Sequence, residues 1–119
     1  EFRRVLFRSE THVYPDEYAA TLEELVVLTE PVVKGIVLIT PYYIEPNRQD
    51  RMRARMDEYG KIVKQIATRH KTLFVDTQAA FDRVMKHTYP ATLAWDRVHP
   101  TVVGHMVLAR AFLAGVDFK

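Results

Sequence analysis

The sequence predicts an α/β protein in which helices cover a sheet of two parallel strands. Ile36–Thr40 and Leu73–Val75 are short apolar runs, which are typical of strands covered on both faces. A stretch with helical periodicity, Asp50 to His70, separates them, and a helix of that length makes the strands parallel through a right-handed crossover. Because a parallel strand that is buried on both faces needs neighbours, we expect the chain to form part of a larger domain.

The composition is that of an ordinary globular domain. Hydrophobic residues make up 48% of the 119 residues and charged residues 27%, and a chain of this length forms one domain. The chain has no cysteine, which excludes a disulfide framework, a thiolate zinc site and a cysteine nucleophile. Its 17 basic and 15 acidic residues alternate in sign along the predicted helices, so we expect no nucleic-acid partner. The apolar run Gly35 to Ile39 is too short for a transmembrane segment.

Residues 1–9 do not have the pattern of a native element. The chain has no initiator methionine, it begins Glu1-Phe2, which a common cloning site encodes, and its first apolar residues follow no regular period. We therefore interpret residues 1–9 as a cloning or assembly scar and residues 10–119 as the native part of the chain. A short edge strand from Arg4 to Arg8 is the alternative interpretation.

Capping residues and apolar periodicity predict four main helices. The expected helices run from Tyr14 to the stop at Pro31, from Asp50 to His70, from Thr77 to about Met85 and from Val102 to Leu113. Asp76 supplies a capping oxygen for the third helix, and Thr101 supplies one for the last. Gly115 ends the last helix, which is apolar on almost all sides.

The long helix has two faces of opposite character. Its apolar stripe is formed by residues at spacings of four and three, namely Met52, Met56, Tyr59, Val63 and Ile66. Arg51, Arg53 and Arg55 fall outside that stripe, and we expect them on the solvated side. Arg53 is also spaced to pair with Asp57 one helical turn later. The prediction is therefore that Met52 is buried and Arg53 is exposed.

The residues with the clearest chemistry lie in a loop just before the last helix. Asp96 and His99 are close together there, and Pro100 stiffens the loop. A carboxylate beside an imidazole accepts a hydrogen bond from Nδ1–H, which fixes the tautomer and leaves Nε2 free to act as a general base. The residues alone leave three interpretations: a catalytic pair, a non-catalytic α/β interaction module, or a metal site in which His105 joins Asp96 and His99.

Tyr42, Tyr43 and Glu45 are further candidates for contact with a ligand. They follow the C-terminal end of the first predicted strand, which is where α/β folds bind ligands. In one interpretation they line an acyl or sugar pocket, and in the other they form a packed loop.

The Asp96–His99 loop and three other segments together resemble a known family. The loop is Asp96-Arg97-Val98-His99-Pro100, it is followed by Gly104-His105 and an apolar helix, and it is preceded by Ile36–Thr40 with Pro41 and by Val75-Asp76. These features resemble the second half of the SGNH hydrolases, the GDSL-type esterases and lipases. The resemblance implies a three-layer, flavodoxin-like α/β/α fold, of which residues 10–119 are the C-terminal portion. It also implies that Asp96 orients His99, that His99 deprotonates a serine which attacks an ester, and that no cofactor is needed.

Two motifs of that family are absent from this sequence. The family's nucleophile lies in a Gly-Asp-Ser motif, whereas Ser9, the one serine here, follows Arg8. Its oxyanion hole uses a Gly-x-Asn-Asp motif, whereas Asn47, the one asparagine, follows Pro46. We therefore predict that this chain alone hydrolyses no ester at a meaningful rate, because nucleophile and oxyanion donors carry most of the acceleration.

The resemblance also implies partners for the full-length parent and for this chain. The parent would take a small-molecule ester: an acyl ester, an acetylated sugar or a lysophospholipid. In the chain itself, the strand Ile36–Thr40 would present an unpaired edge, and we expect low stability or self-association through that edge.

Overall fold

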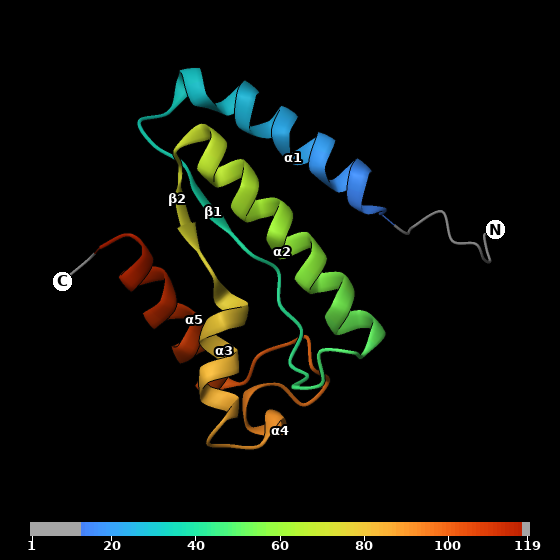
Figure 1. Ribbon diagram of the computed structural model, residues 1–119. Helices are drawn as coiled ribbons and strands as arrows, with labels where there is room; N and C mark the ends of the chain where they lie inside the picture. The colour runs from blue at the N-terminus through green and yellow to red at the C-terminus, as the bar shows by residue number, and fades with distance from the viewer. Residues whose placement is uncertain (1–12, 118–119) are drawn as a thin grey trace.

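The computed structural model describes residues 13–117, so the interpretation of residues 1–9 falls outside the described residues. Within that range, helices and strands follow one another in the predicted order (Figure 1). The short elements η1 and α4 were not predicted, and α4 falls in a stretch that the sequence analysis left without a helix. The elements are α1 (Pro15–Thr29), η1 (Glu30–Val32), β1 (Val37–Ile39), α2 (Arg51–His70), β2 (Leu73–Val75), α3 (Thr77–Met85), α4 (Pro90–Leu93) and α5 (Val102–Gly115).

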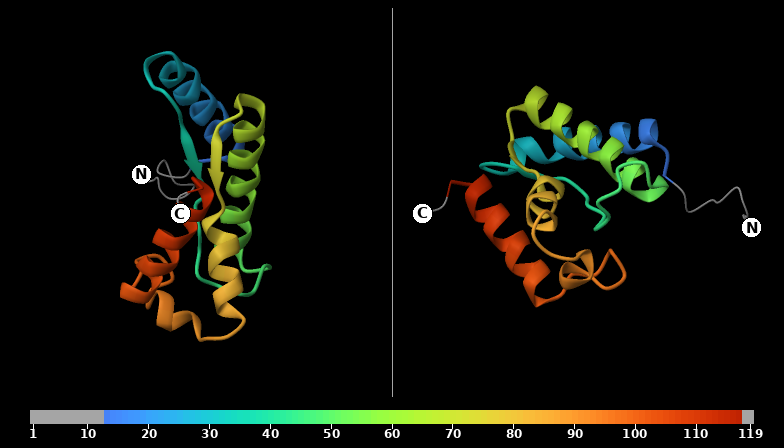
Figure 2. Two further views of the ribbon diagram at one scale, coloured as in Figure 1. Left: turned by 90° about the vertical axis from the view of Figure 1, so that its left-hand side faces the viewer. Right: turned by 60° about the horizontal axis from the view of Figure 1, so that its bottom comes forward.

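β1 and β2 form a parallel two-stranded sheet, which confirms the crossover predicted through α2. At one end of the pair, Leu73 N–H donates to the carbonyl oxygen of Ile36 at 3.0 Å. At the other end, Thr40 N–H donates to the carbonyl oxygen of Val75 at 3.0 Å. α2 and α5 lie on opposite sides of this sheet, so the layers are those of an α/β/α fold (Figure 2).

Two clusters of buried apolar residues hold the layers together. The first lies between α1, α2 and β1 and comprises Val26, Leu38, Val63, Ile66 and Ala67. The second joins α3 and α4 to the loop after β1 and comprises Ile44, Phe81, Leu93 and Ala94. Leu93 and Ala94 lead directly into the loop that carries Asp96 and His99. The second cluster therefore supports the candidate site.

In the first turn of α2, the side chains that are buried differ from those predicted. The apolar stripe is buried from Tyr59 onward, as predicted. Arg53, however, is 1% exposed, whereas Met52 is 49% exposed, so both predictions for this turn were wrong. The physical reason is that the buried side of this turn faces carboxylates. Asp57 and Asp82 lie 2.9 and 2.7 Å from the Arg53 guanidinium and offset the desolvation of its charge.

The two predicted N-caps are confirmed, whereas the last helix includes Gly115 and has Val116 as its C-cap. The Asp76 carboxylate accepts the Ala79 N–H at 2.9 Å at the start of α3. Thr101 Oγ1 accepts the Gly104 N–H at 3.2 Å at the start of α5. Within residues 13–117, none of the helices has both the length and the apolar character needed to cross a membrane.

Candidate active site

Residues 94–100, which we call the site loop, connect α4 with α5 and carry Asp96 and His99. The loop is closed at its base, where Ala94 and Pro100 form an antiparallel bridge. Gly104 lets the first turn of α5 approach this base closely, because a Cβ there would lie 2.4 Å from the carbonyl oxygen of Leu93. The site loop therefore starts from a fixed base although Asp96 and His99 themselves are exposed.

Asp96 and His99 are brought together as a hydrogen-bonded pair. His99 Nδ1 lies 2.5 Å from Asp96 Oδ2, and Asp96 Oδ1 accepts the backbone N–H groups of His99 at 2.7 Å and Val98 at 2.9 Å. The backbone hydrogen bond from His99, the bond to its ring and the bond from Val98 hold the pKa of Asp96 well below its ordinary value. The carboxylate is therefore charged at neutral pH and accepts only, so Nδ1 is the ring nitrogen that carries hydrogen.

The imidazole of His99 is open to a reactant. Its side chain is 85% exposed. A hollow of about 370 Å³ lies beside it and is lined by Trp95, Asp96, His99, Pro100 and Thr101. With Nδ1 bound to Asp96, Nε2 is the nitrogen left to take a proton from a hydroxyl in this hollow and to return it, which is the chemistry of a general base.

The β1–α2 loop contacts the site loop through Tyr42, Ile44 and Glu45. Ile44 N–H donates to the Arg97 carbonyl oxygen at 3.0 Å. The Tyr42 hydroxyl donates to the Val98 carbonyl oxygen at 2.9 Å. The Glu45 carboxylate lies 3.4 Å from the Arg97 guanidinium. Of the two sequence interpretations, these contacts favour a packed loop, and the hollow is lined by other residues.

His105 does not join Asp96 and His99 around a common centre. Its Nδ1 lies 3.0 Å from the Thr101 carbonyl oxygen, within the first turn of α5. Across residues 13–117, no three His, Asp or Glu side chains are grouped so that they could hold a metal ion. The described residues therefore contain no set of ligands that would support the metal-site interpretation.

Of the two residues that depart from the family motifs, only Asn47 is among the described residues. Ser9 falls outside the described residues. Asn47 is exposed, and its side-chain oxygen accepts the Gln49 N–H at 3.0 Å in the turn before α2. Asn47 therefore stabilises a local turn.

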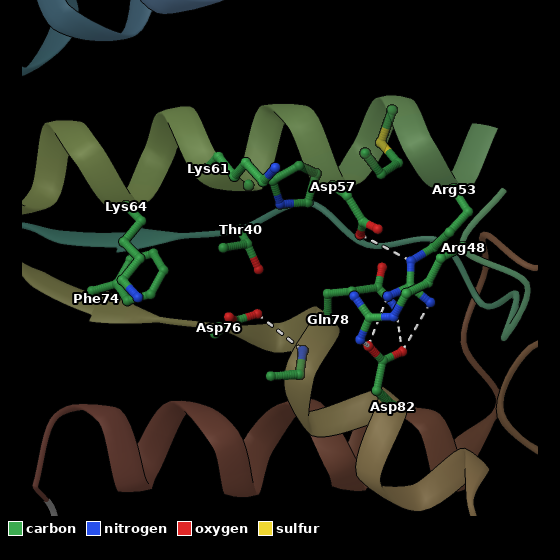
Figure 3. A pocket seen from close by; sticks show the side chains of 14 residues that line it. Thr40, Arg48, Arg53, Asp57, Lys61, Lys64, Phe74, Asp76, Gln78 and Asp82 are labelled. Atoms are coloured by element: carbon green, nitrogen blue, oxygen red, sulfur yellow. Dashed lines mark hydrogen bonds and ion pairs between the residues drawn. The ribbon is translucent and has the colours of Figure 1, made fainter. Parts of the chain in front are cut away.

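A second hollow, of about 360 Å³, lies between α2 and α3 and was not predicted (Figure 3). At its end Arg53 bonds through Nε to Asp57 at 2.9 Å and through Nη2 to Asp82 at 2.7 Å. Its Nη1 donates to the carbonyl oxygen of Glu45 at 2.7 Å. The spacing of Arg53 and Asp57 predicted that they pair, but no local pattern predicted that Arg53 is buried. Arg53 thus fixes the β1–α2 loop, which in turn contacts the site loop.

Comparison with known proteins gives consistent matches over most of the chain. A family model described as GDSL-like lipase/acylhydrolase matches residues 5–112. An acetylxylan esterase of Geobacillus stearothermophilus is 64% identical over 113 residues, which are 95% of this chain and 52% of that protein. A crystal structure of an acetylxylan esterase from the same organism matches 92% of this chain and 50% of its own with a TM-score of 0.90 and 64% identity.

A second structural relative comes from a different source. It is described as an alpha/beta hydrolase enzyme from the metagenome of Lake Arreo, Spain. It is 57% identical to this chain and has a TM-score of 0.88, over 91% of this chain and 50% of its own. The chain therefore spans about half the length of the relatives that it matches.

Several solved structures of the Geobacillus esterase carry substitutions. Three are described as catalytic mutants, in which a serine, an aspartate, or the histidine three positions after that aspartate is replaced by alanine. In a fourth, the tryptophan immediately before the same aspartate is replaced.

Proposed function

The chain belongs to the GDSL-like lipase/acylhydrolase family, and from this premise we propose that it carries the acid–base part of an ester-hydrolysing site. His99 is the general base, and Asp96 is the residue that orients it. The observation that carries this proposal is the 2.5 Å contact between His99 Nδ1 and a charged Asp96. Trp95, Asp96 and His99 also have the spacing of the tryptophan, aspartate and histidine replaced in the Geobacillus esterase.

The proposed reaction is acyl transfer to water through a serine. Nε2 of His99 takes the proton of the serine hydroxyl as its oxygen attacks the ester carbonyl carbon. The bond to the alcohol breaks when His99 returns that proton to the leaving oxygen, and an acyl-serine remains. Water, deprotonated by the same Nε2, then attacks the acyl-serine. The bond to the serine oxygen breaks as His99 returns this proton to it, and the carboxylic acid and the serine hydroxyl are released. Asp96 stays charged throughout and stabilises the imidazolium.

In this proposal the serine lies outside residues 10–119, which are the C-terminal portion of an SGNH hydrolase domain. The chain covers about half of its relatives, and Ser9, its one serine, has no Gly-Asp before it. The 119-residue chain by itself therefore hydrolyses no ester at a meaningful rate. It acts as an esterase when the remainder of the domain completes the site.

The proposed substrate is an acetyl ester of a xylo-oligosaccharide. The support is the name of the relative at 64% identity, an acetylxylan esterase. Among the three ester classes that the family resemblance allowed, this favours an acetylated sugar over a long acyl ester or a lysophospholipid.

A fusion protein tests this proposal. The preceding half of the Geobacillus esterase is joined to residues 13–119 of this chain, and acetate release from acetylated xylo-oligosaccharides is measured. We expect turnover, and we expect His99→Ala to lower kcat by about 10³-fold or more, because the general base is lost. Asp96→Asn should lower kcat by about 10²-fold or more, since the amide stabilises the wrong tautomer.

His87→Ala is the matched control, because His87 is an exposed histidine outside the site loop. It should leave kcat unchanged. Full activity of the fusion protein with His99→Ala would contradict the proposed base. Rapid hydrolysis by the 119-residue chain alone would contradict the proposed location of the serine.

A further inference from the structure

Two consecutive peptide planes of the site loop are held at both ends. In the peptide unit between Arg97 and Val98, the Arg97 carbonyl oxygen accepts the Ile44 N–H at 3.0 Å. The Val98 N–H of the same unit donates to Asp96 Oδ1 at 2.9 Å. In the next unit, between Val98 and His99, the Val98 carbonyl oxygen accepts the Tyr42 hydroxyl at 2.9 Å. The His99 N–H of that unit donates to the same Asp96 oxygen at 2.7 Å. Because a peptide unit is planar, a fixed carbonyl sets the direction of the N–H at the other end.

The site loop needs such contacts because its own packing is sparse. The side chains of His99 and Asp96 are 85% and 54% exposed, and Val98 is 46% exposed. Arg97 has a φ of 70°, a left-handed conformation that residues with a Cβ rarely adopt. Beyond the hydrogen bonds within the loop, its conformation therefore depends on the residues that bind its carbonyl groups from outside.

Tyr42 is the contact that links the site loop to the core through a side chain. Its ring packs on Phe81 with ring centroids 4.8 Å apart and a tilt of 51°. Phe81 is fully buried in the second core cluster. The other side-chain contacts, of Tyr43 and Glu45 with Arg97, involve a guanidinium that is about half exposed, so they hold the site loop less firmly.

We propose that Tyr42 is a positioning residue for His99. Its hydroxyl holds the Val98 carbonyl so that the following N–H points at Asp96 Oδ1, which leaves Asp96 Oδ2 aligned with His99 Nδ1. The inference rests on the proposed function of the pair, and it extends that function to a residue of the β1–α2 loop.

The test measures the tautomer of His99 in the full 119-residue chain. Histidine is labelled with ¹⁵N, and the ring nitrogen shifts are recorded at about pH 8, where an ordinary imidazole is neutral. The wild-type chain should hold His99 as the Nδ1–H tautomer, and Asp96→Asn should shift it toward Nε2–H. Tyr42→Phe keeps the ring on Phe81 and removes only the hydroxyl. It should lower the ratio of Nδ1–H to Nε2–H by about threefold to tenfold.

Tyr89→Phe is the matched control, because Tyr89 is 82% exposed and lies outside the site loop. It should leave the tautomer ratio unchanged. If Tyr42→Phe also leaves the ratio at its wild-type value while Asp96→Asn changes it, the positioning role is wrong and the proposed pair stands. If Asp96→Asn has no effect either, or if wild-type His99 is already Nε2–H, the proposed function itself fails.

The fusion protein gives a second measurement. Tyr42→Phe should lower kcat for acetate release by about threefold to tenfold and leave KM unchanged, because the base is misaligned and the substrate contacts are intact. A residue with only a structural role would lower the melting temperature without this change in kcat. An unchanged kcat would overturn the proposal.

Discussion

Arg53 occupies a position in the first turn of α2 where each guanidinium nitrogen has a partner. Burial alone would lower its pKa, but the hydrogen bonds to Asp57 and Asp82 outweigh burial and raise the pKa further above its ordinary value. Asp57 and Asp82 are 25% and 20% exposed, so water reaches the carboxylates more easily than the guanidinium. The network therefore ties α2 to α3 through a permanently charged side chain.

Replacement of Arg53 by methionine should lower the free energy of unfolding by about 2–3 kcal/mol. Removal of one partner of a buried ion pair leaves the other charge unpaired, and the partial exposure of Asp57 and Asp82 keeps the loss below that of a fully buried pair. Urea unfolding measures the change. Arg51→Met, an exposed substitution in the same turn, is the control and should change stability by less than about 0.5 kcal/mol. Equal midpoints for the two variants would contradict this role.

At the scale of elements, α1 is attached to α2 by an aromatic contact and a charged cluster. Tyr18 of α1 stacks on Tyr59 of α2 with ring centroids 4.3 Å apart. At the other end of α1, His70 lies 2.5 Å from Glu23 and 3.2 Å from Glu30. The hydrogen bond with Glu23 raises the pKa of His70, and the same bond lowers the pKa of Glu23.

The attachment of α1 should therefore depend on pH. The His70 contribution is complete below its ordinary pKa of about 6.5 and is lost as the pH rises through the higher value in the folded chain. The Glu23 contribution is complete above about 4.5 and is lost as the pH falls through its lowered value. We therefore expect α1 to be attached most strongly between about pH 4.5 and pH 6.5.

Urea unfolding at about pH 5.5 and about pH 8.5 measures this dependence. Wild-type protein should lose more stability between the two conditions than His70→Gln does. His87→Gln, which replaces an exposed histidine, should behave as wild type. The same pH dependence in the wild type and in His70→Gln would contradict the prediction.

At the scale of the whole molecule, much apolar surface faces outward. On α1 and β1 it includes Leu25, Val27, Leu28 and Ile39, and on α5 it includes Val102, Val103, Met106, Phe112 and Leu113. Within residues 13–117, β1 pairs with β2 alone, so one edge of β1 is open. An open strand edge beside exposed apolar side chains favours pairing with another copy of the chain.

The 119-residue chain should therefore self-associate as its concentration is raised, as measured by sedimentation velocity. Ile39, which is 46% exposed on β1, is the residue to change. Ile39→Lys should weaken the association, because a charge on an edge strand opposes edge-to-edge pairing. Trp95→Lys, an equal charge change in the site loop, is the control. A chain that stays monomeric and unfolds in one cooperative transition would contradict this prediction.

The sequence by itself determined the features that depend on neighbours along the chain. The strands around Leu38 and Phe74, and the caps Asp76 and Thr101, follow from short-range patterns and were confirmed. The contact between Asp96 and His99 is of the same kind, since both residues lie in one short turn. The partners in such contacts are close along the chain, so a short pattern is enough to predict them.

The tertiary structure alone decided which distant residues support the site. Tyr42 and Val98 are 56 positions apart, and Arg53 and Asp82 are 29 positions apart, so no periodic pattern in the sequence connects them. The sequence predicts a solvated Arg53 because its burial depends in part on Asp82, a carboxylate that α3 brings to it. Long-range packing thus decides how the Asp96–His99 turn is held, whereas local chemistry decides that the turn exists.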